Sequence, residues 1–150
     1  MDISQANHSI VPFLWFNNNL KEAIDYYQTV FKDVQIEALQ QHGSQVFGGT
    51  FVINGQRFHG LNGGPMYPFT PAFSLFISCE NQEEIDYYWE KLIFNGKSSK
   101  CGWLVDQFGL SWQVIPKDLG NYIQHPAGMQ AMLGMEKISI EDLRKAVQAQ

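Results

Sequence analysis

The tetrapeptide Ile24-Asp25-Tyr26-Tyr27 recurs 61 positions later as Ile85-Asp86-Tyr87-Tyr88. The sequence around each copy follows the same order, with one apolar run before it and two apolar runs, separated by a turn, after it. The runs before the copies, Val11–Phe16 and Ala72–Ile77, are also 61 positions apart. Two similar units, neither able to bury its apolar face alone, are typical of a duplicated fold. The sequence therefore predicts two related modules.

Hydrophobic periodicity predicts a strand, a helix and three further strands in the first module. Asn17–Asn19 forms a turn cluster that can also cap the helix. Asn54-Gly55 is typical of a two-residue β-hairpin turn, because both positions of that turn need a positive φ. The predicted elements are a strand at Ile10–Phe16, a helix at Leu20–Phe31, and strands at Val34–Leu39, Val46–Ile53 and Gln56–Leu61.

The second module repeats this order and is followed by a tail of different character. Residues 95–100 leave room for only a short second strand, the one that matches Val34–Leu39, or for none. In the tail, Ser139 with Asp142 three residues later resembles a capping box, which predicts a terminal helix around Ile140–Ala149. The other predicted elements are strands at Ala72–Ser78, Trp103–Asp106 and Leu110–Pro116 and a helix at Gln82–Phe94.

Length and composition indicate one domain that spans residues 1–150. It comprises a polar segment 1–9, a first module at about 10–62, a linker at 63–71, a second module at about 72–116 and a helical tail at 117–150. A net charge of −5, with ten Lys and Arg that form no run, argues against nucleic-acid binding. No stretch approaches 18 apolar residues and no signal pattern opens the chain, so no membrane contact and a cytoplasmic location are expected. Cys79 and Cys101 are then expected to be free thiols.

Four motifs resemble the PhnB-like branch of the vicinal oxygen chelate superfamily, which holds glyoxalases, extradiol dioxygenases and bleomycin-resistance proteins. The motifs are Leu14–Asn17, Leu61–Pro65, Glu84–Trp89 and Cys101–Gln113, and the resemblance covers about residues 8–135. It implies an α+β fold in which two βαβββ modules form a cupped open barrel, here with C-terminal helices. The branch is widely labelled demethylubiquinone methyltransferase-like. Neither helix start has the Gly-rich turn that a nucleotide-type cofactor needs, so no cofactor is expected.

The resemblance also implies four positions for a metal ligand, on the first and fourth strands of each module. Counting from the helix and turn motifs places Pro12 and Phe73 on the first strands, and His59 and Gln113 on the fourth strands. Proline and phenylalanine cannot bind a metal, whereas catalytic zinc normally has three protein ligands. No metal is therefore expected, although Cys101 or Glu80 could complete an atypical site.

Five residues are candidates for binding a ligand in the cup, and no catalytic residue is assigned. His59 could bind or act as a base, because imidazole titrates near neutral pH, or could line the cup without chemistry. Gln113 could orient a substrate group or satisfy backbone groups. Trp15 and Trp103 could line a pocket or belong to a core. Cys101 could be a nucleophile or an inert thiol. Through strand alternation, His59 and Gln113 are expected to face one shared cavity, with the other three near its rim.

The sequence favours a metal-free small-molecule binding protein whose ligand is unknown. The alternative is a lyase, isomerase or transferase that uses His59 as general base while Gln113 polarises the substrate, and a structural or interaction module remains a third option. Whether the chain is an enzyme is left open. A homodimer is expected, because open sheet edges need cover and most oligomers are two-fold symmetric.

Overall fold

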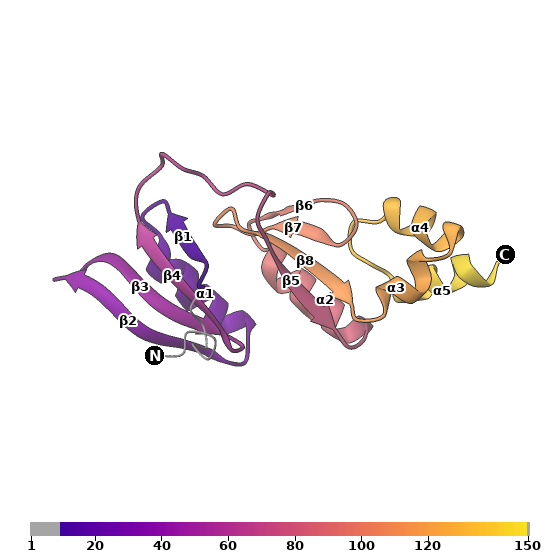
Figure 1. The fold of residues 1–150 in the computed structure, drawn as a ribbon, viewed down its shortest axis with the longest axis horizontal. Helices are drawn as coiled ribbons and strands as arrows, with labels where there is room; N and C mark the ends of the chain where they lie inside the picture. Colours follow the sequence, from indigo (N-terminus) through magenta and orange to yellow (C-terminus); the bar gives the residue numbers. More distant parts are fainter. Residues whose placement is uncertain (1–9, 150) are drawn as a thin grey trace. The chain divides into compact units, whose positions relative to one another are not determined.

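A computed structural model describes residues 10–149, so the polar segment 1–9 lies outside the described residues. The chain divides into two compact units, one ending at Pro68 and the other beginning at Phe69. This boundary falls within the predicted linker 63–71. Each unit contains a mixed sheet of four strands that stays open (Figure 1). The predicted α+β fold, with two βαβββ modules and C-terminal helices, is confirmed.

The first module has the strand order β1-β4-β3-β2, in which only β1 and β4 are parallel. The first strand begins at Phe13 rather than at Ile10, although the Pro12 carbonyl still accepts a hydrogen bond from His59 N. The second strand continues to His42 rather than ending at Leu39, so only Gly43-Ser44 separates it from the third strand. The elements are β1 Phe13–Phe16, α1 Leu20–Val30, β2 Val34–His42, β3 Gln45–Ile53 and β4 Gln56–Asn62.

Helix α1 covers one face of the first sheet and leaves the other face open. The buried helix positions recur at steps of three and four, as the periodicity predicts. They pack with the alternate strand residues that point to the helix, among them Phe51 and Phe58, whose rings stack with centroids 5.4 Å apart. Of the paired tyrosines, Tyr27 is fully buried. The core of this module therefore lies between α1 and the sheet.

The cap of helix α1 comes from a residue distant in sequence. Asn62 Oδ1 accepts a hydrogen bond from Leu20 N at 2.9 Å, and Asn62 Nδ2 donates to Val46 O at 2.9 Å. Asn19 holds the N-cap position, but its side chain makes no capping hydrogen bond. The cluster Asn17–Asn19 therefore supplies the N-cap residue, as predicted, whereas the capping side chain is that of Asn62 at the end of β4.

The second module repeats this plan in the strand order β5-β8-β7-β6. Its second strand, β6, is only two residues long, as the short interval at 95–100 predicts. Helix α2 begins after Asn81, whose side chain caps Glu84 N. The elements are β5 Ser74–Cys79, α2 Gln82–Ile93, β6 Lys97–Ser98, β7 Trp103–Val105 and β8 Ser111–Pro116.

One buried carboxylate organises the turn between β7 and β8. Asp106 Oδ1 accepts hydrogen bonds from Phe108 N and Leu110 N, at 2.8 and 3.1 Å. Its Oδ2 accepts from Trp112 Nε1 at 2.8 Å. The side chain is enclosed, since Asp106 is only 3 % exposed. The long motif at Cys101–Gln113 thus contains a structural anchor.

The tail forms three short helices that pack on the second module. They are α3 Leu119–Ile123, α4 Pro126–Leu133 and α5 Ile140–Gln148. The predicted cap of the last helix is confirmed, because Ser139 Oγ accepts from Asp142 N at 3.2 Å. Ile138 and Leu143 are fully buried and form one apolar cluster with Ile115 of β8. Between residues 10 and 149, every helix is too short or too polar to span a membrane.

Candidate functional site

Three side chains stand in a row on the open face of the second sheet. Gln113 on β8 is paired with Phe76 on β5 and with Trp103 on β7. Residues paired directly across neighbouring strands point to the same face. The amide therefore lies between two aromatic rings, and Phe76 is 60 % exposed.

This row belongs to the wall of a cavity of about 400 Å³. The sheet supplies one side of the cavity, and the tail supplies apolar side chains on another. The lining residues are Phe76, Ser78, Cys101, Trp103, Gln113, Ile115, Pro116, Lys117, Leu119, Gly120, Ile123 and Met132. The volume and the mainly apolar lining are typical of small-molecule sites.

The polar groups of this face are incompletely satisfied within the described chain. Gln113 Nε2 donates to Ser74 Oγ at 3.0 Å, whereas no described group bonds to Gln113 Oε1. On the same face, Ser111 Oγ is buried and lacks a hydrogen-bond partner among residues 10–149. An amide oxygen in a cavity wall without a protein partner can accept a hydrogen bond from a ligand.

The two cysteines are free thiols, as predicted, and they differ in environment. Cys101 is half-buried in the cavity wall, and its backbone has a positive φ of 58°. Cys79 is buried beneath helix α2, where burial, with a smaller effect of Glu84, raises the pKa of its thiol to about 11. The two thiols should therefore differ in reactivity.

We expect iodoacetamide at about pH 8 to alkylate Cys101 in the folded protein and to leave Cys79 unmodified. The attacking species is the thiolate, and the raised pKa keeps Cys79 protonated in addition to its burial. Peptide mass spectrometry should find one adduct in the native protein and two in urea. Equal modification of both cysteines in the native protein would contradict this assignment.

The first module carries an equivalent row on its own open face. His59 on β4 is paired with Phe13 on β1 and with Thr50 on β3. Thr50 Oγ1 and His59 Nδ1 are 2.8 Å apart and form a hydrogen bond. The threonine orients the imidazole, while the described residues provide no hydrogen bond to Nε2.

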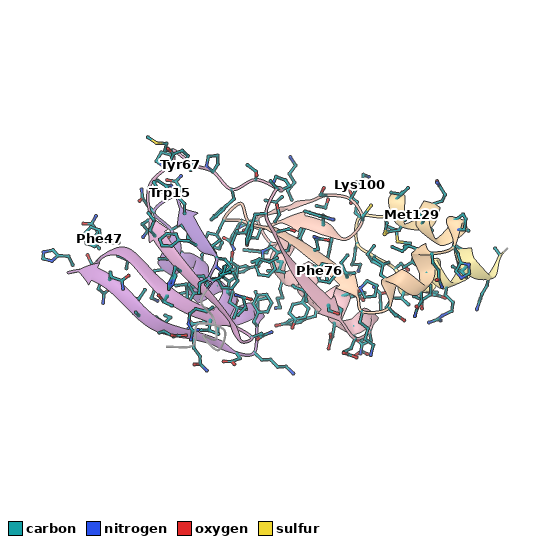
Figure 2. All side chains as sticks on the ribbon, viewed as in Figure 1. Trp15, Phe47, Tyr67, Phe76, Lys100 and Met129 are labelled. Atoms are coloured by element: carbon teal, nitrogen blue, oxygen red, sulfur yellow. The ribbon has the colours of Figure 1, made fainter. Side chains whose placement is uncertain are left out.

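Trp15 is held in place by the segment that follows β4. Its Nε1 donates to Gly64 O at 2.9 Å, and its ring meets the Tyr67 ring edge-on, with centroids 5.0 Å apart (Figure 2). A Cβ atom at Gly63 would lie only 2.2 Å from the indole, so the close approach requires glycine. Trp15 is thus part of a rigid aromatic pair.

The structure brings three of the five predicted ligand-binding residues together. Cys101, Trp103 and Gln113 line one cavity, whereas His59 and Trp15 lie in the other unit. His59 and Gln113 lie on matching strands. Their strand registers differ, however. His59 is paired with Phe13, which the 61-residue repeat matches to Ser74, whereas Gln113 is paired with Phe76, two residues further along β5.

Sequence reasoning missed the contribution of Phe76 and of the tail. The alternation along Ala72–Ser78 predicts which face of the sheet Phe76 points to. Which residues lie beside Phe76 depends on the strand register, which the sequence does not show. Nothing in the sequence indicated which tail residues reach the sheet. The tail residues in the cavity wall are Lys117, Leu119, Gly120, Ile123 and Met132.

The residues at the four implied metal positions do not fit a divalent ion. Pro12 and Phe73 have no donor atom in their side chains. His59 supplies a single imidazole, and Gln113 offers only a neutral amide. No group of three His, Cys, Asp or Glu side chains that could hold a metal ion occurs among residues 10–149.

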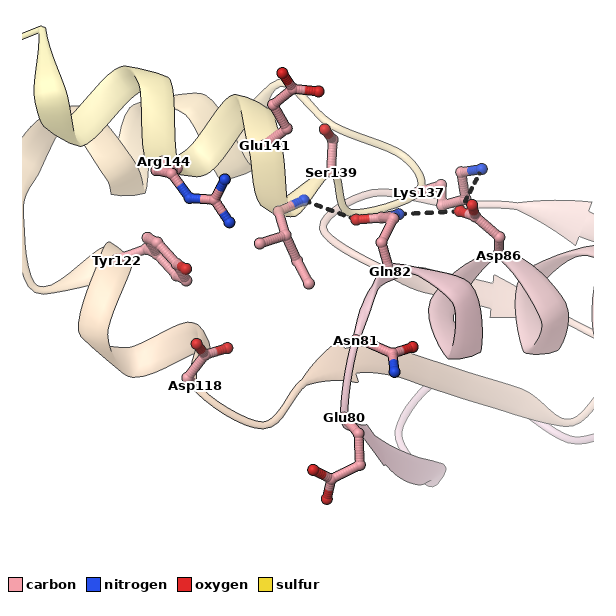
Figure 3. A pocket seen from close by; sticks show the side chains of 11 residues that line it. Glu80, Asn81, Gln82, Asp86, Asp118, Tyr122, Lys137, Ser139, Glu141 and Arg144 are labelled. Carbon is pink, nitrogen blue, oxygen red and sulfur yellow. Dashed lines mark hydrogen bonds and ion pairs between the residues drawn. The ribbon is translucent and has the colours of Figure 1, made fainter.

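A larger cavity of about 570 Å³ lies between α2, α3 and α5 (Figure 3). Most of the residues in its wall have polar or charged side chains of both signs. Two ion pairs involve them: Lys137 with Asp86 at 2.8 Å, and Glu80 with Lys117. None of the predicted ligand-binding residues lines it. The apolar cavity on the sheet is therefore the better candidate site.

Comparison with known proteins matches residues 8–115 to the family described as 3-demethylubiquinone-9 3-methyltransferase. The solved structure of the PhnB protein from Bacillus cereus is 31 % identical with a TM-score of 0.66, and the match covers 72 % of this chain and 98 % of that one. A protein from Pseudomonas aeruginosa is 19 % identical with a TM-score of 0.55, covering 69 % and 92 % of the two chains.

The fosfomycin resistance protein FosX from Listeria monocytogenes, solved with Mn(II) and sulfate, is 14 % identical with a TM-score of 0.52. That match covers 69 % of this chain and 87 % of FosX. At 19 % and 14 % identity, the Pseudomonas aeruginosa protein and FosX show only that they share a fold with this chain. No curated protein sequence matches the chain.

Proposed function

We propose that this chain, which belongs to the 3-demethylubiquinone-9 3-methyltransferase family of PhnB-like proteins, is a metal-free small-molecule binding protein. The observation that supports the proposal is the 400 Å³ cavity on the second sheet, where Gln113 stands between Phe76 and Trp103. Aromatic walls contribute affinity by burial, and a polar group among them fixes the orientation of a ligand.

Methyl transfer is not part of this proposal. A nucleotide-type methyl donor would require a Gly-rich turn at the amino end of a helix. The turn before α1 is Asn17–Asn19, and α2 begins directly after Glu80-Asn81. The family description therefore serves here as a statement of relationship.

The uncharged dye N-phenyl-1-naphthylamine, which carries one N–H donor, tests the cavity directly. We expect its fluorescence to rise on binding to the native protein. Gln113→Ala should weaken binding about threefold to tenfold, the effect of one lost hydrogen bond. Gln130→Ala is the matched control, because Gln130 is exposed on α4 outside the cavity. If neither Gln113→Ala nor Trp103→Ala changes the affinity for the dye, the dye binds elsewhere and the proposal is overturned.

Elemental analysis of untagged protein tests the metal-free part of the proposal. We expect well under one equivalent of zinc, manganese, iron or nickel, because the four implied positions offer one imidazole and one neutral amide. A stoichiometric metal that is lost on His59→Ala would overturn it and favour an enzyme.

The orientation of His59 supports a second candidate function, a lyase, isomerase or transferase with His59 as general base. When Nδ1–H donates to Thr50 Oγ1, Nε2 keeps its lone pair and can accept a proton. The proposal then assigns to Gln113 the role of polarising the substrate. A reaction whose rate falls on both His59→Gln and Thr50→Val, and whose pH profile shifts in the second variant, would favour this candidate.

We further propose that the protein is a homodimer with two-fold symmetry. The open sheets present strand edges that need cover, and aromatic side chains such as Phe13 and Phe76 are exposed on the open faces. Light scattering at micromolar concentration should give about twice the chain mass of 17.1 kDa. A particle of the single-chain mass would exclude the dimer.

A further inference from the structure

The tail supplies a wall of the cavity, although it lies outside the matched family region. The family match ends at residue 115, within β8. Beyond that point the chain returns to the open face of the sheet. Leu119 and Ile123 of α3 and Met132 of α4 then line the cavity. The cavity is therefore bounded partly by a segment that the family region does not contain.

The tail is attached to the sheet by backbone hydrogen bonds beside the cavity. Cys101 N donates to Met135 O at 2.9 Å, and Gly102 N donates to Glu136 O at 2.8 Å. Gly102 has a φ of +85°, and a Cβ atom there would lie 2.8 Å from Ile115 Cδ1. Only glycine permits this close contact without strain.

A second attachment comes from the side chain of Gln82 at the start of α2. Its Oε1 accepts from Ile140 N at 2.9 Å, and its Nε2 donates to Ile138 O at 3.0 Å and to Asp86 Oδ1 at 2.9 Å. Lys137 also pairs with Asp86 at 2.8 Å (Figure 3). The Gln82 amide thus bonds to one backbone carbonyl and one backbone N–H where the chain enters α5.

An apolar cluster between the tail and β8 holds this wall of the cavity in place. Ile115 is buried against Ile138 and Leu143, and it also faces the cavity. Met132 packs against the same cluster while it lines the cavity, whereas Ile123 lines the cavity without being part of that cluster. The wall is therefore held by packing and hydrogen bonds together.

The chemistry of the complete lining restricts the ligand. Lys117 is the charged residue of the lining, and its ammonium group is paired with Glu80. The polar group at the centre of the sheet is Gln113. Its Oε1, which has no hydrogen-bond partner among residues 10–149, can accept a hydrogen bond but cannot donate one. Because Glu80 already neutralises Lys117, a ligand charge buried here would meet no unpaired counter-charge among the described lining residues.

We infer that the tail sets the ligand specificity of the site, and that the ligand is an uncharged, mainly apolar molecule with a hydrogen-bond donor for Gln113 Oε1. The tail side chains of Ile123 and Met132 limit the length of its apolar part. This inference rests on the proposed ligand-binding function of the same cavity.

Displacement of N-phenyl-1-naphthylamine by primary n-alkanols, from butanol to decanol, measures the apolar length that the cavity accepts. Affinity should rise about fourfold for each buried methylene until the chain meets the tail, and should then stop rising. Ile123→Ala and Met132→Ala should each move this limit to longer alkanols. Leu133→Ala is the matched control, because Leu133 is 52 % exposed on α4 and does not line the cavity.

The donor requirement is tested by comparing 1-octanol with 1-methoxyoctane, its methyl ether. The alcohol should bind about threefold to tenfold more tightly, and Gln113→Met, which keeps the side-chain length, should abolish the difference. Equal binding of the two by the native protein would overturn the ligand class. An unchanged length limit in both Ile123→Ala and Met132→Ala would overturn the role of the tail.

Absence of the ligand site and absence of a role for the tail would give different results. If the dye does not bind, or binds independently of Gln113 and Trp103, the proposed function fails. The dye could instead bind through these residues while Leu133→Ala changes the longest accepted alkanol as much as Ile123→Ala does. In that case only the inference about the tail fails. Circular dichroism confirms that each variant is folded before it is scored.

Discussion

We expect Asp106→Ala to lower the free energy of unfolding of the second unit by about 3–5 kcal/mol, because three N–H donors lose the charged acceptor that they share. The carboxylate accepts hydrogen bonds from Phe108 N, Leu110 N and Trp112 Nε1. Alanine would leave these donors without their acceptor in a closed environment, and each buried unpaired donor costs about 1–3 kcal/mol. Folded domains are stable by only about 5–15 kcal/mol, so the variant should be close to unfolding.

Urea denaturation followed by tryptophan fluorescence measures this loss, because three of the four tryptophans belong to the second unit. Asp106→Asn should have an intermediate effect, since an amide keeps one acceptor oxygen but places an N–H₂ group against another donor. The matched control is Asp25→Ala, which removes an exposed carboxylate paired with Lys21 and should cost under about 1 kcal/mol. A loss for Asp106→Ala no larger than the control would refute the anchoring role.

Ile138→Ala should cost about 2–5 kcal/mol and should also abolish dye binding at the sheet cavity. The removed atoms leave a void in the cluster of Ile115, Ile138 and Leu143, and large-to-small changes in a core cost this much. The loss loosens the tail that carries Ile123 and Met132, so the cavity wall loses its position.

Thermal and urea unfolding measure the stability of Ile138→Ala, and dye titration at a temperature where the variant is folded measures the site. Ile10→Ala is the matched control, since Ile10 is 90 % exposed in the first unit and its truncation should change stability by under about 0.5 kcal/mol. Full dye affinity in a folded, destabilised Ile138→Ala protein would show that the tail does not hold the cavity together.

The repeat predicted the architecture because most of the helices and strands are specified by local sequence patterns. Helices α1 and α2 follow from apolar positions at steps of three and four, and the β3–β4 hairpin follows from Asn54-Gly55. Errors occurred where distant residues decide a local feature. The cap of α1 is supplied by Asn62, 42 residues beyond Leu20, and the first strand starts late because its pairing with β4 begins at Phe13.

The candidate site was predicted in part, since strand alternation states which residues share a face but not which residues are neighbours. Cys101, Trp103 and Gln113 were predicted and do line one cavity. Phe76 was missed, because its position beside Gln113 depends on the β5–β8 register. The shared cavity that would unite His59 with Gln113 stays a prediction.

By itself the sequence determined the duplicated βαβββ plan, the family, and the absence of a metal-donor side chain at Pro12 and Phe73, because these follow from residue type and local spacing. Tertiary structure alone decided that the tail forms a wall of the cavity. That wall depends on contacts between residues far apart in the chain, such as Gly102 with Glu136 and Gln82 with Ile140. Such contacts form only when the entropy cost of closing long loops is offset by burial, and no local pattern encodes that balance.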